Sequence, residues 1–201
     1  MILNNFKKIV VKIGSTTIID QASGKLKTKW LNSICEDIAE LANTNKKIAI
    51  VSSGAIALGK NLISNHKPIK RLEDKQAAAA IGQIELAKHW QQALKKYKIN
   101  TAQLLLTLND SEERRRYLNA RKTITSLHNK RVIPIINEND TVATEEIRYG
   151  DNDRLAARVA QMMGANLLVL LSDIDGLYTA NPYINKQATR VSNIKIIDEM
   201  I

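Results

Sequence analysis

Residues 8–14, KIVVKIG, form a short run of apolar and β-branched residues that ends at a glycine. Such a run predicts a buried strand followed by a tight turn. A second run of this type, KIAIV at Lys47–Val51, is followed by residues 52–54, SSG. Between the two runs, apolar residues recur at helical spacing and predict a helix over Lys29–Asn43 with Thr28 as its cap. The chain therefore begins with a strand, a helix and a second strand.

The same alternation continues along most of the chain. Further strands are predicted over Ala102–Leu106, Val132–Ile136 and Asn166–Leu171, and Pro134 would have to lie where its strand needs no N–H donor. Further helices are predicted after Gly54 and over Leu72–Tyr97, the second with an interruption near Gly82. Two more are predicted over Ser111–Asn129, with Ser111 as cap, and over Asn152–Met163, with Asp151 as cap. Ser172–Pro182 is predicted as a loop. Strands that alternate with helices predict an α/β fold, here a three-layer αβα sandwich around a mainly parallel central sheet.

Length and composition suit one such domain. The chain has 201 residues, of which 44% are hydrophobic and only 4% aromatic, so the core must be aliphatic, as in buried parallel sheets. No apolar run approaches the roughly 20 residues that span a bilayer, and the first residues lack the apolar stretch of a signal peptide. The single cysteine, Cys35, is predicted to be a core residue, and its isolation favours a reducing cytoplasm.

The net charge of +10 raises the question of a nucleic-acid partner. The basic residues are spread along the chain, no RNA-binding signature occurs, and aromatic residues do not alternate with the charges as in a stacking platform. We therefore interpret the charge as a solvated surface, part of which could meet anionic substrates. The histidines at positions 66, 89 and 128 have no ligand spacing with Cys35 and predict no metal site.

Polar motifs follow four of the predicted strands. In parallel sheets with helices on both faces, ligands bind at the carboxyl ends of the strands. Small or charged residues stand at these ends in Lys12–Ser15, Ser52–Ala55, Asn137–Asp140 and Ser172–Asp173. The sequence therefore predicts a binding site at this edge of the sheet.

The first two motifs suit a phosphate group. Gly14 and Gly54 let the backbone approach a ligand closely, and each precedes a segment whose amides can face an anion. Lys12 places an ammonium group beside the same turn, where it could neutralise charge during phosphoryl transfer. A lysine that ends a strand is more often a surface residue, and the P-loop signature is absent, so this motif alone is a weak indication.

A dense group of carboxylates and amides lies on both sides of a short polar stretch. These residues are Asn137, Glu138, Asn139, Asp140, Asp151, Asn152 and Asp153. They could bind the ammonium group of an amino acid, hold lysines in position or face magnesium. A helix cap would explain Asp151 and a turn would explain Asn139 and Asp140, but neither explains the whole group, so a site is favoured. The alternative for Ser172–Asp173 is a polar loop.

In order and spacing, the motifs over residues 8–182 resemble the amino-acid kinase family, whose fold is carbamate kinase-like. The segments that carry this resemblance are VVKIGSTTI, IVSSGAIALG, KQAAAAIGQ, LLLT, YLNARKT, IPIINENDTVA, YGDNDRLAA and LLSDIDGLYTANP. Three of them, KQAAAAIGQ, NARKT and INENDTV with GDND, are similar to the glutamate kinase branch of the family.

The resemblance implies a role for each matching residue. By this resemblance Lys12 contacts the ATP phosphates, Gly14 and Gly54 supply backbone donors, and Ser172 and Asp173 lie against the nucleotide. Ser53, Asp140 and Asn152 are implied to hold glutamate, and Asp153 to orient the catalytic lysines. The implied reaction is ATP-dependent phosphorylation of the side-chain carboxylate of L-glutamate to glutamyl 5-phosphate, the first step of proline biosynthesis. Mg²⁺ is expected with ATP, and a homo-oligomer and proline as an effector are also implied.

One part of the family pattern is not matched. Nothing after Pro182 resembles the further glycine-rich segment with its Thr-Lys pair, which holds adenine nucleotide and a second catalytic lysine, or an RNA-binding-like PUA domain. We expect a single amino-acid kinase domain over residues 1–201 without its usual carboxyl-terminal segment. One alternative is a remnant that binds glutamate or proline without transferring phosphate, or that needs a partner chain. Another is a different amino-acid kinase, such as an acetylglutamate-type enzyme. The weakest alternative is a nucleic-acid-binding protein.

Overall fold

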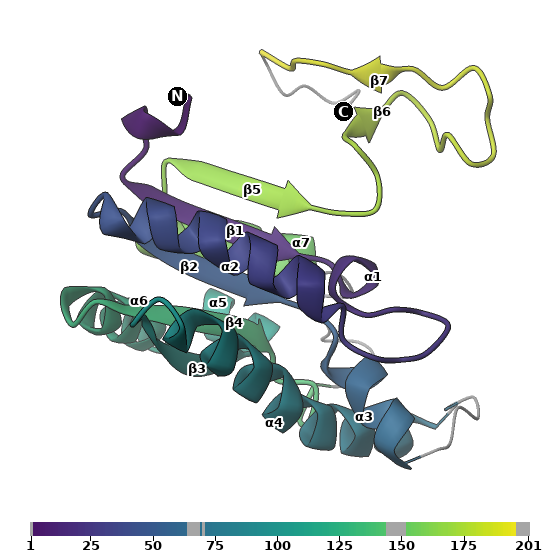
Figure 1. The fold of residues 1–201 in the computed structure, drawn as a ribbon, viewed down its shortest axis with the longest axis horizontal. Coiled ribbons are helices and arrows are strands. Elements are labelled where there is room, and N and C mark those ends of the chain that lie inside the picture. The colour runs from purple at the N-terminus through teal and green to yellow at the C-terminus, as the bar shows by residue number, and fades with distance from the viewer. Residues whose placement is uncertain (1, 64–68, 70, 144–151, 196–201) are drawn as a thin grey trace. The chain divides into compact units, whose positions relative to one another are not determined.

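The computed structural model describes residues 2–63, 69, 71–143 and 152–195, in two units, Met1–Leu171 and Ser172–Ile201. The described part of the first unit contains a five-stranded parallel sheet in the order β3-β4-β2-β1-β5 (Figure 1). Its strands are β1 (Lys8–Ile13), β2 (Lys47–Ser52), β3 (Asn100–Leu106), β4 (Val132–Glu138) and β5 (Leu167–Leu171). The predicted parallel sheet is thus confirmed.

Helices cover both faces of this sheet. The described helices of this unit are η1 (Ile2–Asn5), α1 (Ser15–Ile18), α2 (Thr28–Asn43), α3 (Ala55–Ile63), α4 (Leu72–Lys95), α5 (Leu108–Glu112), α6 (Arg114–Asn129) and α7 (Asn152–Met163). Along β1, Ile9 and Val11 pack in a core with α2, α3 and α4, whereas Val10 packs in a second core with α6 and α7. Successive side chains of a strand point to opposite faces, so one apolar run serves both cores and the three-layer prediction is confirmed.

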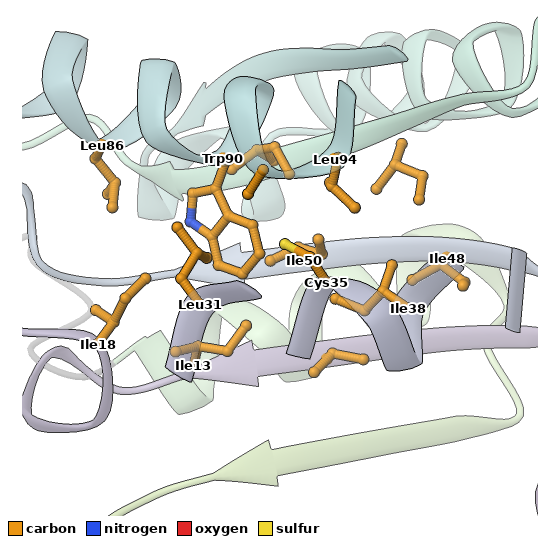
Figure 2. Packing of buried hydrophobic residues seen from close by; sticks show 14 of the residues in the cluster. Ile13, Ile18, Leu31, Cys35, Ile38, Ile48, Ile50, Leu86, Trp90 and Leu94 are labelled. Atoms are coloured by element: carbon orange, nitrogen blue, oxygen red, sulfur yellow. The ribbon is translucent and has the colours of Figure 1, made fainter. Parts of the chain in front are cut away.

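Among the fully buried side chains described in the core between the sheet and α2, α3 and α4, Trp90 is the one aromatic ring, and Phe6 and Trp30 are partly buried against this core. Figure 2 shows Trp90 of α4 beside Leu31 and Cys35 of α2, and all three are fully buried or nearly so. Burial raises the pKa of the Cys35 thiol to about 12. A thiol with so high a pKa is not a thiolate nucleophile at neutral pH, which agrees with the prediction of a core residue.

The predicted interruption of the long helix near Gly82 is wrong. The helix α4 runs unbroken through Gly82, where α3 crosses it. A Cβ atom at Gly82 would lie 1.8 Å from the Ala55 carbonyl oxygen, and one at Gly59 would lie 1.7 Å from the Ala78 carbonyl oxygen. Both glycines are therefore needed for the close approach of two helices and do not end either helix.

Two predicted helix caps are also corrected. Thr28 is the first residue of α2, and the cap position is taken by Lys27, which makes no side-chain cap hydrogen bond. The segment predicted as one helix over Ser111–Asn129 forms two helices, α5 and α6, with Glu113 between them. Ser111 lies inside α5, where its hydroxyl donates to the Leu108 carbonyl at 2.8 Å.

The cap of α5 is Thr107, which forms a capping box with Asp110. The Asp110 carboxylate accepts from the Thr107 backbone N–H at 2.6 Å and from its hydroxyl at 2.8 Å. This reciprocal bonding satisfies donors at the helix start and begins the helix three residues before the predicted cap, Ser111. The predicted cap of α7, Asp151, lies outside the described residues.

The second unit contains a short antiparallel pair, β6 (Leu177–Tyr178) and β7 (Arg190–Val191), with Leu177 opposite Val191. The segment Ser172–Pro182, predicted as a loop, thus contains one of these strands. The Tyr178 hydroxyl donates to the Asp175 carboxylate at 2.7 Å. Across the described ranges of both units, no helix is long and apolar enough to cross a membrane.

Candidate active site

The carboxyl ends of the parallel strands lie at one edge of the sheet, where backbone hydrogen bonds join the turns. The Ser53 N–H donates to the Ile13 carbonyl and the Gly14 N–H donates to the Leu171 carbonyl, both at 3.1 Å. The Asn139 N–H donates to the Leu106 carbonyl at 2.9 Å. The turns that follow β1, β2 and β4 are therefore held close to neighbouring strand ends.

An ion pair lies at the centre of this edge. Lys12 is in β1 with only 7% of its side chain exposed, and its ammonium nitrogen lies 2.6 Å from Oδ1 of Asp153, the second residue of α7. A buried ammonium group needs a partner of opposite charge because burial removes its hydration. The Asp153 side chain is 41% exposed, so solvent or a ligand can approach the pair from the Asp153 side.

The two glycines predicted to bind phosphate differ in what the backbone requires of them. Gly54 has φ +113°, a conformation that side chains disfavour, and a Cβ there would lie 3.2 Å from Ile19 Cγ1. Gly14 has an ordinary φ of −69°. A Cβ at Gly14 would lie 3.8 Å from the Lys12 ammonium nitrogen. The turn at Gly14 thus lies beside the Lys12 charge.

A chain of polar side chains runs from the end of β2 into the protein. Asn152 Nδ2 donates to Ser53 Oγ at 2.7 Å and to Asn137 Oδ1 at 2.8 Å. Asn137 Nδ2 in turn donates to Gln83 Oε1 at 2.7 Å. Asn137, Gln83 and Asn152 are all buried, so these hydrogen bonds replace water that the side chains have lost. We refer to Ser53, Asn152, Asn137 and Gln83 as the amide chain.

Asp140, predicted to bind glutamate with Ser53 and Asn152, lines a cavity of about 230 Å³ that Gln83 also lines. Glu138, Asn139 and Thr141 contribute polar groups to the same cavity. Ser53 and Asn152 are therefore in direct contact. Asp140 lines the same cavity as Gln83, and Gln83 is linked to Asn152 and Ser53 by the hydrogen bonds of the amide chain.

The predicted nucleotide contacts Ser172 and Asp173 belong to the second unit. The Ser172 hydroxyl donates to the Asp173 carboxylate at 3.0 Å, and both residues are exposed. The family resemblance implies that they act with Lys12, and this remains a prediction.

Two members of the amide chain have no individual role in the sequence-based prediction. Asn137 enters it only as part of a polar group, and Gln83 only as the last residue of a motif in an alanine-rich helix. A signal for Gln83 does exist, because it is polar and yet lies on the buried side of α4 with Ala79 and Leu86. Such a residue needs a hydrogen-bond partner, and the partner is Asn137.

Among the residues that the structure describes, no three His, Cys, Asp or Glu side chains are placed to hold a metal ion. At this edge, Asp153 uses its carboxylate on the Lys12 ammonium group. A magnesium ion that arrives with nucleotide would take most of its ligands from the phosphates and water and would need only one or two carboxylates, which is its usual mode in kinases.

Comparison with known proteins agrees with this geometry. The family model described as the amino acid kinase family matches residues 7–201. The glutamate 5-kinase of Allorhizobium ampelinum is 58% identical over 92% of this chain and 47% of its own length. Glutamate 5-kinase 1 of Mesorhizobium japonicum is 61% identical over 90% of this chain and 47% of its own length. The glutamate 5-kinase of Agrobacterium fabrum is 58% identical over 96% of this chain and 49% of its own length.

A solved structure shares the fold. The UMP kinase of Bacillus anthracis matches with a TM-score of 0.61 at 16% identity, over 92% of this chain and 72% of that one. The chain spans about half the length of the curated relatives that it matches. The matched family model covers nearly all of the chain. The parallel sheet of the chain, the polar motifs at its strand ends and the buried Lys12 agree with that match. This chain belongs to the amino acid kinase family.

Proposed function

We propose that this chain carries the site of an ATP-dependent glutamate 5-kinase, which converts L-glutamate to glutamyl 5-phosphate in the first step of proline biosynthesis. The observation that carries the proposal is the buried Lys12 ammonium group, held by Asp153 at 2.6 Å, at the same sheet edge as Ser53 and Asn152. The relatives named glutamate 5-kinase support the choice of substrate.

The reaction needs charge stabilisation more than proton transfer. A glutamate side chain has an ordinary pKa of about 4.3 and is already ionised at neutral pH, so its carboxylate attacks without a general base. The carboxylate oxygen forms a bond to the γ-phosphorus while the bond from that phosphorus to the oxygen bridging it to ADP breaks. Lys12 neutralises charge on the transferring group, and Asp153 keeps the ammonium in place, so no covalent enzyme intermediate is required.

Binding and positioning fall to the remaining residues. Ser53, Asp140 and Asn152 hold glutamate, Gly14 and Gly54 let backbone amides face the phosphates, and Ser172 and Asp173 lie against the nucleotide. Magnesium accompanies ATP. Our proposal further includes a single amino-acid kinase domain, a cytoplasmic homo-oligomer and proline as an effector, as the resemblance implies.

The proposal is tested by trapping the acyl phosphate with hydroxylamine in the presence of L-glutamate and magnesium-ATP. The unmodified chain should form hydroxamate, and Lys12→Met should lose activity by about 100-fold to 1,000-fold, the usual cost of removing one charge-stabilising group. Lys8→Met is the matched control, because Lys8 lies on the same strand but donates to the Met163 carbonyl. The control should retain activity.

The outcomes separate the open alternatives. Hydroxamate formed equally by the Lys12→Met protein would remove Lys12 from the mechanism. A folded chain that binds glutamate but forms no hydroxamate would support the remnant or partner-dependent alternative. Faster reaction with acetylglutamate or aspartate than with glutamate would point to another amino-acid kinase.

A further inference from the structure

We infer that Gln83 is a positioning residue, which sets the direction of the hydrogen bonds along the amide chain and so decides which groups Ser53 and Asn152 present to a ligand. The inference rests on the proposed function, because the ligand in question is the amino-acid substrate. It adds a specificity role for a helix residue that is linked to Asn152 and Ser53 through Asn137.

The direction of the chain follows from the chemistry of amides. A primary amide has an acceptor oxygen and a donor NH₂ group, and each link needs one donor and one acceptor. Gln83 offers Oε1 to Asn137 Nδ2, so Asn137 must offer Oδ1 to Asn152 Nδ2. Turning over the Gln83 amide would place two NH₂ groups against each other, and both asparagines would have to turn over as well.

The observed direction suits an α-amino acid. Asn152 Nδ2 uses its two hydrogens on Asn137 Oδ1 and Ser53 Oγ. Ser53 therefore accepts from Asn152, and its own hydroxyl hydrogen can be donated to a ligand carboxylate. The carbonyl oxygen of Asn152 is then the group that can accept from an ammonium. In the reverse direction Ser53 would donate to Asn152, whose NH₂ group would oppose an ammonium.

Two features hold Gln83 in this orientation. Its side chain is buried, and it lines the cavity that also contains Glu138 and Asp140. Carboxylates in the cavity wall favour the NH₂ group of Gln83 on their side, which leaves Oε1 for Asn137. The neighbouring residue Gly82 fits against Ala55 of α3 with no room for a side chain, so the backbone of α4 is fixed at this point.

The test compares Gln83→Met with Gln83→Glu. If Gln83 only packs, the two variants should have the same order in glutamate affinity as in stability, whereas a positioning role predicts the opposite order in affinity. Met fills the space without a hydrogen bond, whereas Glu keeps an acceptor for Asn137 but adds a buried charge near Glu138 and Asp140. Thermal unfolding should therefore rank Gln83→Met as more stable than Gln83→Glu. Calorimetric titration with L-glutamate should give the reverse order, with Kd raised about 10-fold to 100-fold in Gln83→Met and about threefold or less in Gln83→Glu.

Gln92→Met serves as the control, because Gln92 lies in the same helix as Gln83 but is exposed and lies outside the amide chain. It should bind glutamate as the unmodified chain does. If the glutamate affinities follow the stability order, with Met better than Glu, the positioning role of Gln83 is wrong while the proposed function stands. If the unmodified chain itself binds no glutamate, the proposed function fails and this inference fails with it.

Discussion

A single histidine side chain compensates for a proline inside the sheet. Extending the β2–β4 register, in which Ile50 pairs with Ile135, back by one residue places Pro134 beside Ala49. Proline has no N–H, so it cannot donate to the Ile48 carbonyl. His128 of α6 meets this carbonyl instead, with its Nε2 atom 2.9 Å from the oxygen. A carbonyl oxygen only accepts, so Nε2 carries a hydrogen.

This arrangement makes part of the stability dependent on pH. Burial is the largest effect on His128 and lowers the pKa of its ring below the ordinary value. The folded state therefore favours the neutral ring, while the unfolded chain takes up a proton below about pH 6.5. The stabilisation from His128 is fully present above that pH and is lost as the pH falls toward the lowered pKa of the folded state.

We predict that His128→Gln, which can still donate to the carbonyl but does not titrate, gains stability relative to the unmodified chain as the pH falls. Urea unfolding at pH 7.5 and pH 5 should show the difference in unfolding free energy between the two proteins shift in favour of the variant at pH 5. The same difference at both pH values would show that His128 does not titrate in this range.

At the scale of elements, the crossing of α3 and α4 determines where the amide chain lies. The helices touch through Gly59 and Gly82, where an added Cβ atom would lie 1.7 Å and 1.8 Å, respectively, from a backbone oxygen of the opposite helix. The residue after Gly82 is Gln83, so the tight crossing and the buried amide are neighbours in sequence. Close helix contact thus brings a polar group within reach of β4.

We predict that Gly82→Ala lowers the unfolding free energy by about 1–3 kcal/mol, because its methyl group would force the helices apart. Helix propensity alone predicts the opposite, a gain of about 1 kcal/mol for replacing glycine with alanine. The control is Ala80→Gly on an exposed position of the same helix, which should cost about 1 kcal/mol. A stabilised Gly82→Ala protein in urea unfolding would contradict the close crossing.

At the scale of the molecule, the candidate site joins parts of the first unit that are far apart in sequence. Lys12 is in β1, Ser53 follows β2, Asn137 is in β4, and Asn152 and Asp153 begin α7. A ligand that contacts several of these elements binds the folded chain and not the unfolded one. Substrate binding should therefore stabilise the unit as a whole.

We predict that L-glutamate at about 100 times its Kd stabilises the chain by about 2.7 kcal/mol, which raises Tm by about 5–10 °C for a chain of this size. Ser53→Ala should lose most of this shift, since it removes the hydroxyl that bonds to Asn152. Differential scanning calorimetry with glutamate, aspartate and acetylglutamate measures the effect. A larger shift with either of the other two acids would contradict glutamate as the substrate.

The class of fold and the edge of the sheet that carries the site follow from local sequence patterns. The apolar runs at β1, β2 and β4 are continuous because both faces of these strands are buried, and such a run can be recognised from a short stretch of sequence. Parallel strands bring their carboxyl ends together, so Lys12, Ser53 and Asn137 could be placed at one edge without coordinates. The pairing of Lys12 with Asp153 was expected only through the family resemblance.

The hydrogen bonds that connect those residues depend on how the helices and strands pack together. The low helix propensity of glycine predicts an interruption at Gly82, because propensity describes only the local backbone. The structure requires glycine there for another reason, which is the close approach of α3. Gln83 had no visible role, because a hydrogen bond between residues 54 positions apart depends on how α4 docks against β4. Periodicity in a sequence records which side of an element is buried, whereas the partner of a buried polar group is fixed only when the elements pack together.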